Sequence, residues 1–229
     1  DNTMLVYYPP SLSGTTLNDI PESVTSIAPS AFQDASGLTS INIPAGVTSI
    51  GAEAFQNLGL TEATINVDKV GESGFPTALG SGQTIGGKSG VTIIGYKVFS
   101  GSDGLSGGTA GLTVNDHTAT IAIIKGYSSI GSYAFSNAKS LTSVTFDSIS
   151  NLIIIGSYAF ANTGLTSITI PASVKTIDQY AFRGPSDLTS ITFEPGSILE
   201  TIGQGAFQSA TALTSIIIPA SVKTIDQYA

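Results

Sequence analysis

The segment Leu165–Phe182 reads LTSITIPASVKTIDQYAF, and most of the remaining chain is a variation on it. The same frame recurs as LTSINIPAGVTSIGAEAF at Leu38–Phe55, LTSVTFDSISNLIIIGSYAF at Leu141–Phe160 and LTSITFEPGSILETIGQGAF at Leu188–Phe207. It begins again at Leu213, and Ile218–Ala229 repeats Ile170–Ala181 without a change. Self-similarity at a period of roughly 20 to 50 residues is the signature of a repeat array. We therefore predict a solenoid in which each unit packs only on its neighbours.

Within each unit the apolar residues first alternate and then follow helix-like offsets. Ile168 and Ile170 share one face of an expected strand, and Pro171 ends it because proline has no N–H to donate to a ladder. The spacing from Ile177 to the Ala-Phe pair at Phe182 predicts a short helical or 3-10 turn. The expected fold class is an α/β solenoid with a parallel β-sheet on one face, short helical or 3-10 turns on the other, and an inner row of phenylalanines.

We expect one domain over residues 1–229, in which the units differ in regularity. Residues 1–32 hold an apolar start and only the second half of a repeat, which is typical of an N-terminal capping unit that closes the end of an array. Residues 33–65 and 118–229 follow the frame. The last repeat is cut at Ala229, one residue before the next expected phenylalanine, and we expect the natural protein to continue.

Residues 66–117 depart from the frame because glycines crowd this segment. A degenerate repeat is visible at Val91–Phe99, where IIGYKVF echoes the SIGSYAF of a regular unit. The glycine-rich insertions are expected as two loops, near 71–90 and 100–112. Insertions in solenoids form loops on one face, often the binding face. A flexible excursion without a role is the equal alternative.

Composition excludes several kinds of partner. The chain carries 16 acidic against 8 basic residues, a net charge of −8, and Arg183 is its single arginine. Binding to nucleic acid requires clustered Lys and Arg that displace counterions, so nucleic acid is not expected as a partner, and neither is an anionic membrane surface. The absence of cysteine excludes disulfides and cysteine-ligated metal sites. No stretch approaches the roughly 18 apolar residues of a membrane span, so no membrane insertion is expected in this segment.

The sequence offers little chemistry. His117 is the sole histidine and Asp116 precedes it, but adjacent side chains on an extended segment point to opposite faces, which suits no catalytic relay. The GSDG stretch ending at Gly104 resembles a calcium loop, yet Asp103 is its only carboxylate and calcium needs several oxygen ligands. Residues 86–89 end like a phosphate-binding loop without its earlier glycine. We therefore expect no enzyme, no cofactor and no metal.

Two rows of side chains form the candidate binding face. The first is a ladder of hydroxyls at outward strand positions, repeating at about 4.8 Å per strand, and it comprises Ser143, Thr145, Ser167, Thr169, Ser190 and Thr192. Such a ladder suits an ordered lattice or a glycan, and it is also typical of any solvated parallel sheet. The second row is the tyrosines two residues before successive phenylalanines, namely Tyr133, Tyr158 and Tyr180. These rings either bind a sugar or a partner subunit, or cover the turn with their hydroxyls in water.

The frame LTSITIP followed by SVKTIDQYAF resembles the BspA-like, or treponemal-type, bacterial leucine-rich repeat. The opening LVYYPP and the later IPESVTSIAPSAF are similar to N-terminal units of that family. The resemblance implies a leucine-rich-repeat arc on a secreted or surface-attached bacterial protein that acts in adhesion. It thereby implies an extracellular or cell-surface location, and a protein or glycan on host or neighbouring cells as the partner.

The alternative function is structural. The ends of a solenoid expose surfaces on which another copy can stack. The near-identical repeats carry little charge, so the electrostatic repulsion between the ends of two chains is weak. The alternative is therefore a protein that associates end to end into extracellular filaments or a surface layer.

Overall fold

The computed structural model describes residues 4–5, 16–17, 20–33, 35–70, 72, 74–76, 80–100, 104–105, 119–147 and 150–229. By its internal contacts the chain divides into two compact units, Asp1–Tyr96 and Lys97–Ala229. The division falls within strand β8 (Lys88–Ser100). Each unit has its own buried apolar cluster, and each is described by itself below.

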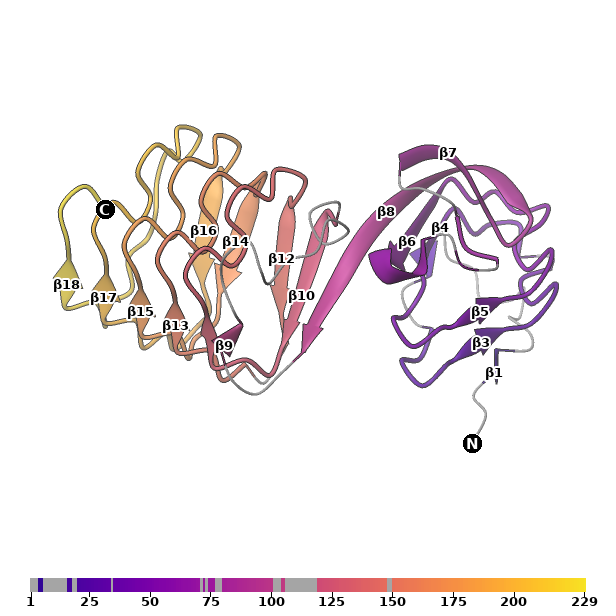
Figure 1. The fold of residues 1–229 in the computed structure, drawn as a ribbon, viewed down its shortest axis with the longest axis horizontal. Helices are drawn as coiled ribbons and strands as arrows, with labels where there is room; N and C mark the ends of the chain where they lie inside the picture. Colours follow the sequence, from indigo (N-terminus) through magenta and orange to yellow (C-terminus); the bar gives the residue numbers. More distant parts are fainter. Residues whose placement is uncertain are drawn as a thin grey trace. The chain divides into compact units, whose positions relative to one another are not determined.

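The second unit is built from two rows of parallel strands contributed by successive repeats (Figure 1). The first row contains β10 (Ile121–Lys125), β12 (Ser143–Phe146), β14 (Ser167–Ile170) and β16 (Ser190–Phe193), paired β10 with β12 and β14 with β16. The second row is a six-stranded sheet of β9 (Gly104–Leu105), β11 (Ser129–Ile130), β13 (Ile154–Ile155), β15 (Thr176–Ile177), β17 (Thr201–Ile202) and β18 (Thr224–Ile225). Each turn of the chain therefore crosses two parallel sheets.

The first unit has the same two-row plan. One row is β1 (Met4–Leu5), β3 (Ser26–Ile27) and β5 (Ser49–Ile50). The other is β2 (Thr16–Leu17), β4 (Ser40–Asn42), β6 (Glu62–Asn66) and β8, all parallel. A further strand, β7 (Gly80–Ile85), pairs antiparallel with β8. The expected loop at 71–90 thus contains β7 and the start of β8, whereas most of the expected loop at 100–112 lies outside the described residues.

The helical or 3-10 turns expected after Ile177 and its equivalents are wrong. The described residues contain no α-helix, and their one 3-10 turn, η1 (Val67–Lys69), lies elsewhere. Two left-handed residues in each repeat explain the difference. The first has φ of 61° at Tyr133, 57° at Tyr158 and 57° at Tyr180, and the second, four residues on, has φ of 64° at Asn137, 55° at Asn162 and 80° at Gly184. A residue with positive φ cannot continue a right-handed helix, so the chain turns sharply at each of these places.

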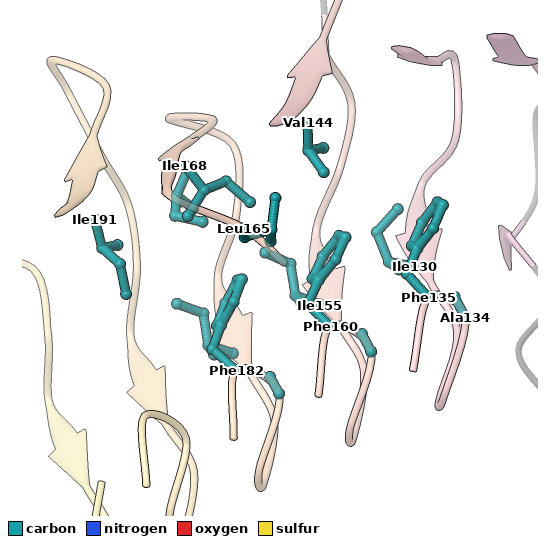
Figure 2. Packing of buried hydrophobic residues seen from close by; sticks show 14 of the residues in the cluster. Ile130, Ala134, Phe135, Val144, Ile155, Phe160, Leu165, Ile168, Phe182 and Ile191 are labelled. Carbon is teal, nitrogen blue, oxygen red and sulfur yellow. The ribbon is translucent and has the colours of Figure 1, made fainter. Parts of the chain in front are cut away.

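A ladder of phenylalanines fills the core of the second unit, as the repeat predicts. Phe135 and Phe160 stack with ring centroids 5.1 Å apart, Phe160 and Phe182 follow at 5.3 Å, and Phe182 and Phe207 at 5.9 Å. Figure 2 shows the first three rings in a row, each rising from its own turn. Phe160 and Phe182 are fully buried, and burial of such a side chain contributes about 1.5–3 kcal/mol. The second unit is therefore a β-solenoid with parallel sheets and an aromatic inner row.

The last turn departs from the regular plan. Residues 213–218 repeat the strand frame in sequence but join no ladder, and Ile217 is 89% exposed. A hollow of about 580 Å³ lies between β16 and residues 215–221. The Ser221 hydroxyl lines this hollow, buried and without a hydrogen-bond partner. The equivalent Ser173 hydroxyl, inside the array, donates to the Leu152 carbonyl at 2.8 Å.

Candidate binding face

The outward hydroxyls are in register only on β14 and β16. Ser167 pairs with Ser190 and Thr169 with Thr192, and the two threonine hydroxyls are 2.9 Å apart. Thr169 and Thr192 are exposed, so the pair faces solvent at the surface of the sheet. Each threonine hydroxyl already uses part of its hydrogen-bonding capacity on the other.

The remaining two predicted hydroxyls have apolar neighbours. On β12, Ser143 is half-buried and Thr145 is exposed. Their register partners on β10 are Ile121 and Ile123. The hydroxyl ladder is therefore short and changes to isoleucine within the first row of strands. The hydroxyls therefore form a small polar patch and not an extended periodic surface that would match an ordered lattice.

The three predicted tyrosines form one stack. Tyr133 and Tyr158 lie with ring centroids 4.9 Å apart and planes 3° from parallel, and Tyr158 and Tyr180 follow at 5.0 Å and 29°. Such offset stacking of neighbouring rings is a favourable arrangement of their quadrupoles. Tyr133 is 50% exposed, and the other two are half-buried. We call Tyr133, Tyr158 and Tyr180 the tyrosine row.

The ends of the tyrosine row differ in what they contact. At the Tyr180 end, the guanidinium of Arg183 lies 5.5 Å from the ring centroid, within cation–π range. The next repeat has Gly205 at the equivalent place, also left-handed with φ of 58°, and a Cβ there would overlap the Tyr180 ring. The row therefore ends against the backbone of Gly205. The facing sides of neighbouring rings cover one another, and Tyr133 remains 50% exposed.

A polar hollow of about 450 Å³ lies beside the second left-handed positions of three successive repeats. Its lining comprises Asn137, Lys139, Asn162, Thr163, Gly164, Gly184, Ser186 and Asp187. The Asn162 side-chain amide donates to the Asn137 Oδ1 at 3.1 Å, which links two successive turns. A Cβ at Gly184 would overlap the Asn162 Oδ1, so glycine ends this asparagine pair as Gly205 ends the tyrosine row.

Threonines that sequence reasoning missed join successive turns. The residue after the first leucine of each unit sends its Oγ1 to the main-chain carbonyl of its equivalent one turn earlier. These bonds run from Thr61 to Thr39 (3.1 Å), Thr142 to Thr120 (3.1 Å), Thr166 to Thr142 (3.4 Å) and Thr189 to Thr166 (3.0 Å). The recurring Leu-Thr pair was the available signal, but a hydroxyl in a repeat does not by itself reveal its acceptor. These threonines stabilise the stacking of turns rather than line the binding face.

Two titrating groups have shifted pKa values for structural reasons. The buried Tyr96 hydroxyl donates to the Ile43 carbonyl at 2.6 Å. Burial, and then the charge of Glu22, raise the pKa of this phenol far above its usual range. Desolvation also raises the pKa of the Asp178 carboxyl, which is half-buried before the left-handed turn at Tyr180. Neither group lies in a cluster of side chains arranged for proton transfer.

The residues weighed for catalysis and calcium binding, His117, Asp116 and Asp103, lie outside the described residues. Gly86 and Gly87 form the turn between β7 and β8, with φ of 48° and 81°, which are typical of a two-residue hairpin turn. In the part of the chain that the structure describes, no three His, Cys, Asp or Glu side chains gather as a metal site would need. Over the same residues, no helix has the length and apolar character to cross a membrane.

The chain belongs to the family described as the BspA type leucine-rich repeat region. The sequence profile of that family matches residues 11–116 and 114–229, with 6 copies of the repeat. The resemblance drawn from the LTSITIP and SVKTIDQYAF segments is thus confirmed. Among curated protein sequences, none matches this chain. Repeats of the leucine-rich kind typically serve as scaffolds that present an extended binding surface.

Solved structures with similar folds come from bacterial leucine-rich repeat proteins. The pneumococcal vaccine antigen PcpA is 24% identical with a TM-score of 0.38, over 63% of this chain and 38% of its own. A leucine-rich repeat protein from Eubacterium ventriosum is 23% identical with a TM-score of 0.39, over 95% and 48%. A leucine-rich cell surface protein from Faecalibacterium prausnitzii is 23% identical with a TM-score of 0.39, over 93% and 58%. This chain therefore spans between 38% and 58% of the length of these relatives.

Proposed function

We propose that this chain is an extracellular binding module of a bacterial surface protein, and that a protein on host or neighbouring cells docks on the tyrosine row. The observation that carries the proposal is the placement of three large aromatic rings at left-handed positions. A non-glycine residue pays about 1–2 kcal/mol for that conformation. Other repeats hold Ser30 and Gly205 at the same place, so the fold itself does not require tyrosine there.

Residue chemistry favours a protein over a glycan as the partner. Tyrosine and arginine are enriched among the residues that dominate protein–protein affinity, and Arg183 lies against the end of the row. A sugar that stacks on an aromatic ring needs an open face, whereas the facing sides of neighbouring rings in this row cover one another. The half-exposed Tyr133 and the Arg183 guanidinium suit contacts with main-chain and side-chain groups of a protein. The family, and one solved relative described as a cell surface protein, support the proposed location.

The test compares two matched variants of the whole chain. Tyr158→Ser removes the middle ring, and serine is the residue that the fold already accepts at the equivalent Ser30 with φ of 55°. Thr145→Ala removes an exposed hydroxyl from the other candidate row. Both are measured by biolayer interferometry against immobilised extracellular-matrix proteins and by attachment to cultured cells.

We expect Tyr158→Ser to raise the dissociation constant at least about tenfold. This corresponds to a loss of roughly 1.4 kcal/mol or more of binding free energy. Thr145→Ala should bind like the parent chain. Weaker binding by Thr145→Ala alone would place the docking face on the strand hydroxyls. Unchanged binding by both variants would mean that neither row is the docking face. Light scattering on the same samples reports whether the chain assembles instead of binding.

A further inference from the structure

We propose that the tyrosine row is a site of oxidative cross-linking, at which Tyr158 becomes covalently joined to Tyr133 or Tyr180 by an oxidant of the peroxidase–peroxide class. The product is a dityrosine bridge between two consecutive turns of the solenoid. This inference is independent of any binding partner, because it rests on the placement of three phenols within one chain.

The placement of the phenols is the first argument. Tyr158 has a neighbouring phenol on each side, at centroid distances of 4.9 and 5.0 Å. The repeat holds all three residues at the same backbone conformation, with φ between 57° and 61°. The rings are therefore held next to one another by the repeat, and none of the three residues is fully buried.

Accessibility is the second argument. Tyr133 is 50% exposed and Tyr158 half-buried, so a small oxidant reaches the row from solvent. Bond formation between ring carbons requires a ring to rotate out of the parallel stack, and Tyr133 at one end of the row is the ring that solvent surrounds most. By contrast the Tyr96 phenol is buried and hydrogen-bonded to the Ile43 carbonyl. Tyr96 is thus shielded from the same reaction.

The chemistry balances with peroxide as the terminal oxidant. Each of two phenols loses one electron and its hydroxyl proton, which leaves a neutral radical with spin density on the ring carbons ortho to oxygen. The two radicals couple by forming one bond between ortho carbons. Each of these carbons then releases its hydrogen as a proton while the phenol oxygen regains one, which restores both aromatic rings. The pair has lost two electrons and two protons overall, and one hydrogen peroxide takes them up to form two waters.

The bridge has a mechanical consequence. It closes a loop of about 25 residues between Tyr133 and Tyr158, or about 22 between Tyr158 and Tyr180, and so restricts the unfolded chain as a disulfide would. The chain contains no cysteine, so no disulfide performs this role. Oxidised chain is therefore expected to unfold at a higher temperature than untreated chain.

The experiment treats the full chain with a peroxidase and hydrogen peroxide, isolates the monomer by size exclusion, and digests it with trypsin. Cleavage after Lys139 and Lys175 places Tyr133, Tyr158 and Tyr180 on three different peptides. We expect joined peptides, lighter by two hydrogens than their sum, that pair Tyr158 with Tyr133 or Tyr180. Dityrosine fluorescence and the thermal midpoint should rise in the same monomer fraction.

Two variants control the experiment. Tyr158→Phe keeps a ring in the stack but has no phenol to oxidise, so both bridges and the rise in thermal midpoint should be lost. Tyr228→Phe changes an exposed tyrosine that Gly205 separates from the row, so the bridges should remain. The proposal is overturned if the monomer contains no joined peptides, if Tyr158→Phe forms bridges to the same extent, or if bridges occur only in dimers.

Discussion

The first of the two left-handed residues in each turn accepts side chains of several kinds. The position two residues before each phenylalanine is left-handed whether it holds serine, glutamate, tyrosine or glycine, as at Ser30, Glu53, Tyr158 and Gly205. Side chains other than glycine adopt this conformation at a cost. The alanine and phenylalanine that follow are buried at Ser30, Glu53 and Tyr158, and their packing offsets this cost.

At Gly205 the absence of a side chain also makes room for the Tyr180 ring. Gly205→Ala should lower the free energy of unfolding by about 1 kcal/mol more than Gly196→Ala. Both glycines are left-handed, so the conformational cost is shared, but nothing lies within 4 Å of a Cβ at Gly196. Urea denaturation of the two variants measures the difference. Equal losses would show that the ring moves aside freely.

The Asp178 carboxyl predicts a pH effect of definite sign. Desolvation raises its pKa in the folded chain above the ordinary value of 3.8, so the folded state binds a proton that the unfolded state has already released. Stability from this group is therefore full at lower pH and falls as the pH rises from the ordinary pKa through the raised one. Asp178→Asn should flatten that decline and unfold at higher urea than the parent near neutral pH. A parallel pH dependence in both chains would contradict the assignment.

At the scale of elements, neighbouring turns are joined by main-chain ladders and by the recurring threonine hydroxyls. Thr189 illustrates both, since its N–H donates to the Thr166 carbonyl at 2.9 Å and its Oγ1 to the same oxygen at 3.0 Å. The side-chain bond adds a contribution that an aliphatic residue of the same shape lacks.

Thr189→Val should therefore cost about 0.5–1.5 kcal/mol, the usual net value of one hydrogen bond. Thr145→Val is the control, because Thr145 is likewise an exposed threonine, within β12 where Thr189 immediately precedes β16, and its change should stay within about 0.5 kcal/mol. Chemical denaturation of both variants gives the comparison. A loss at Thr145 as large as that at Thr189 would assign the effect to strand propensity instead.

The sequence predicted which residues are buried better than it predicted the backbone conformation between them. Ile168, Ile170 and Phe182 were predicted to face inward from periodicity, and all are buried. The second row of strands was missed because each is two residues long, as in Thr176–Ile177, which is too short for a periodic pattern. The turn was mistaken for a helix because tyrosine gives no local signal for positive φ, unlike the glycine or asparagine four residues later.

The two candidate rows also differ in how well the sequence predicted them. Stacking of Tyr133, Tyr158 and Tyr180 follows from their equal place in successive repeats, and the structure brings them together. The hydroxyl ladder was predicted from the same logic, but its continuation depends on what the adjacent strand carries, and β10 carries isoleucine. Residues at the same position of successive repeats lie in one row. Their sequence does not determine which residues lie beside the two ends of that row.

At the scale of the whole molecule, the chain contains two buried clusters that share no residue, one in each compact unit. In a repeat protein each turn is stabilised mainly by the turns beside it. A defect in one cluster should then remain local.

Phe182→Ala tests this expectation. It removes a fully buried ring between Phe160 and Phe207 and should cost about 3–5 kcal/mol in the second unit. Hydrogen exchange measured by mass spectrometry should then speed up across residues 119–229, while residues 20–70 exchange as in the parent chain. Faster exchange in both segments would mean that the two units unfold together.

The left-handed position before each phenylalanine has a further consequence for how such a protein diversifies. It accepts an acid at Glu53, a phenol at Tyr133 and a bare backbone at Gly205 with nearly the same φ, while the buried alanine that follows does not change and neither does the phenylalanine after it. Each turn thus has one position at which the residue varies while the backbone path stays the same, within the limit that the Tyr180 ring sets at Gly205. When a gene duplicates a turn, the new copy adds one such position. Substitution there changes the surface of the protein at that turn alone.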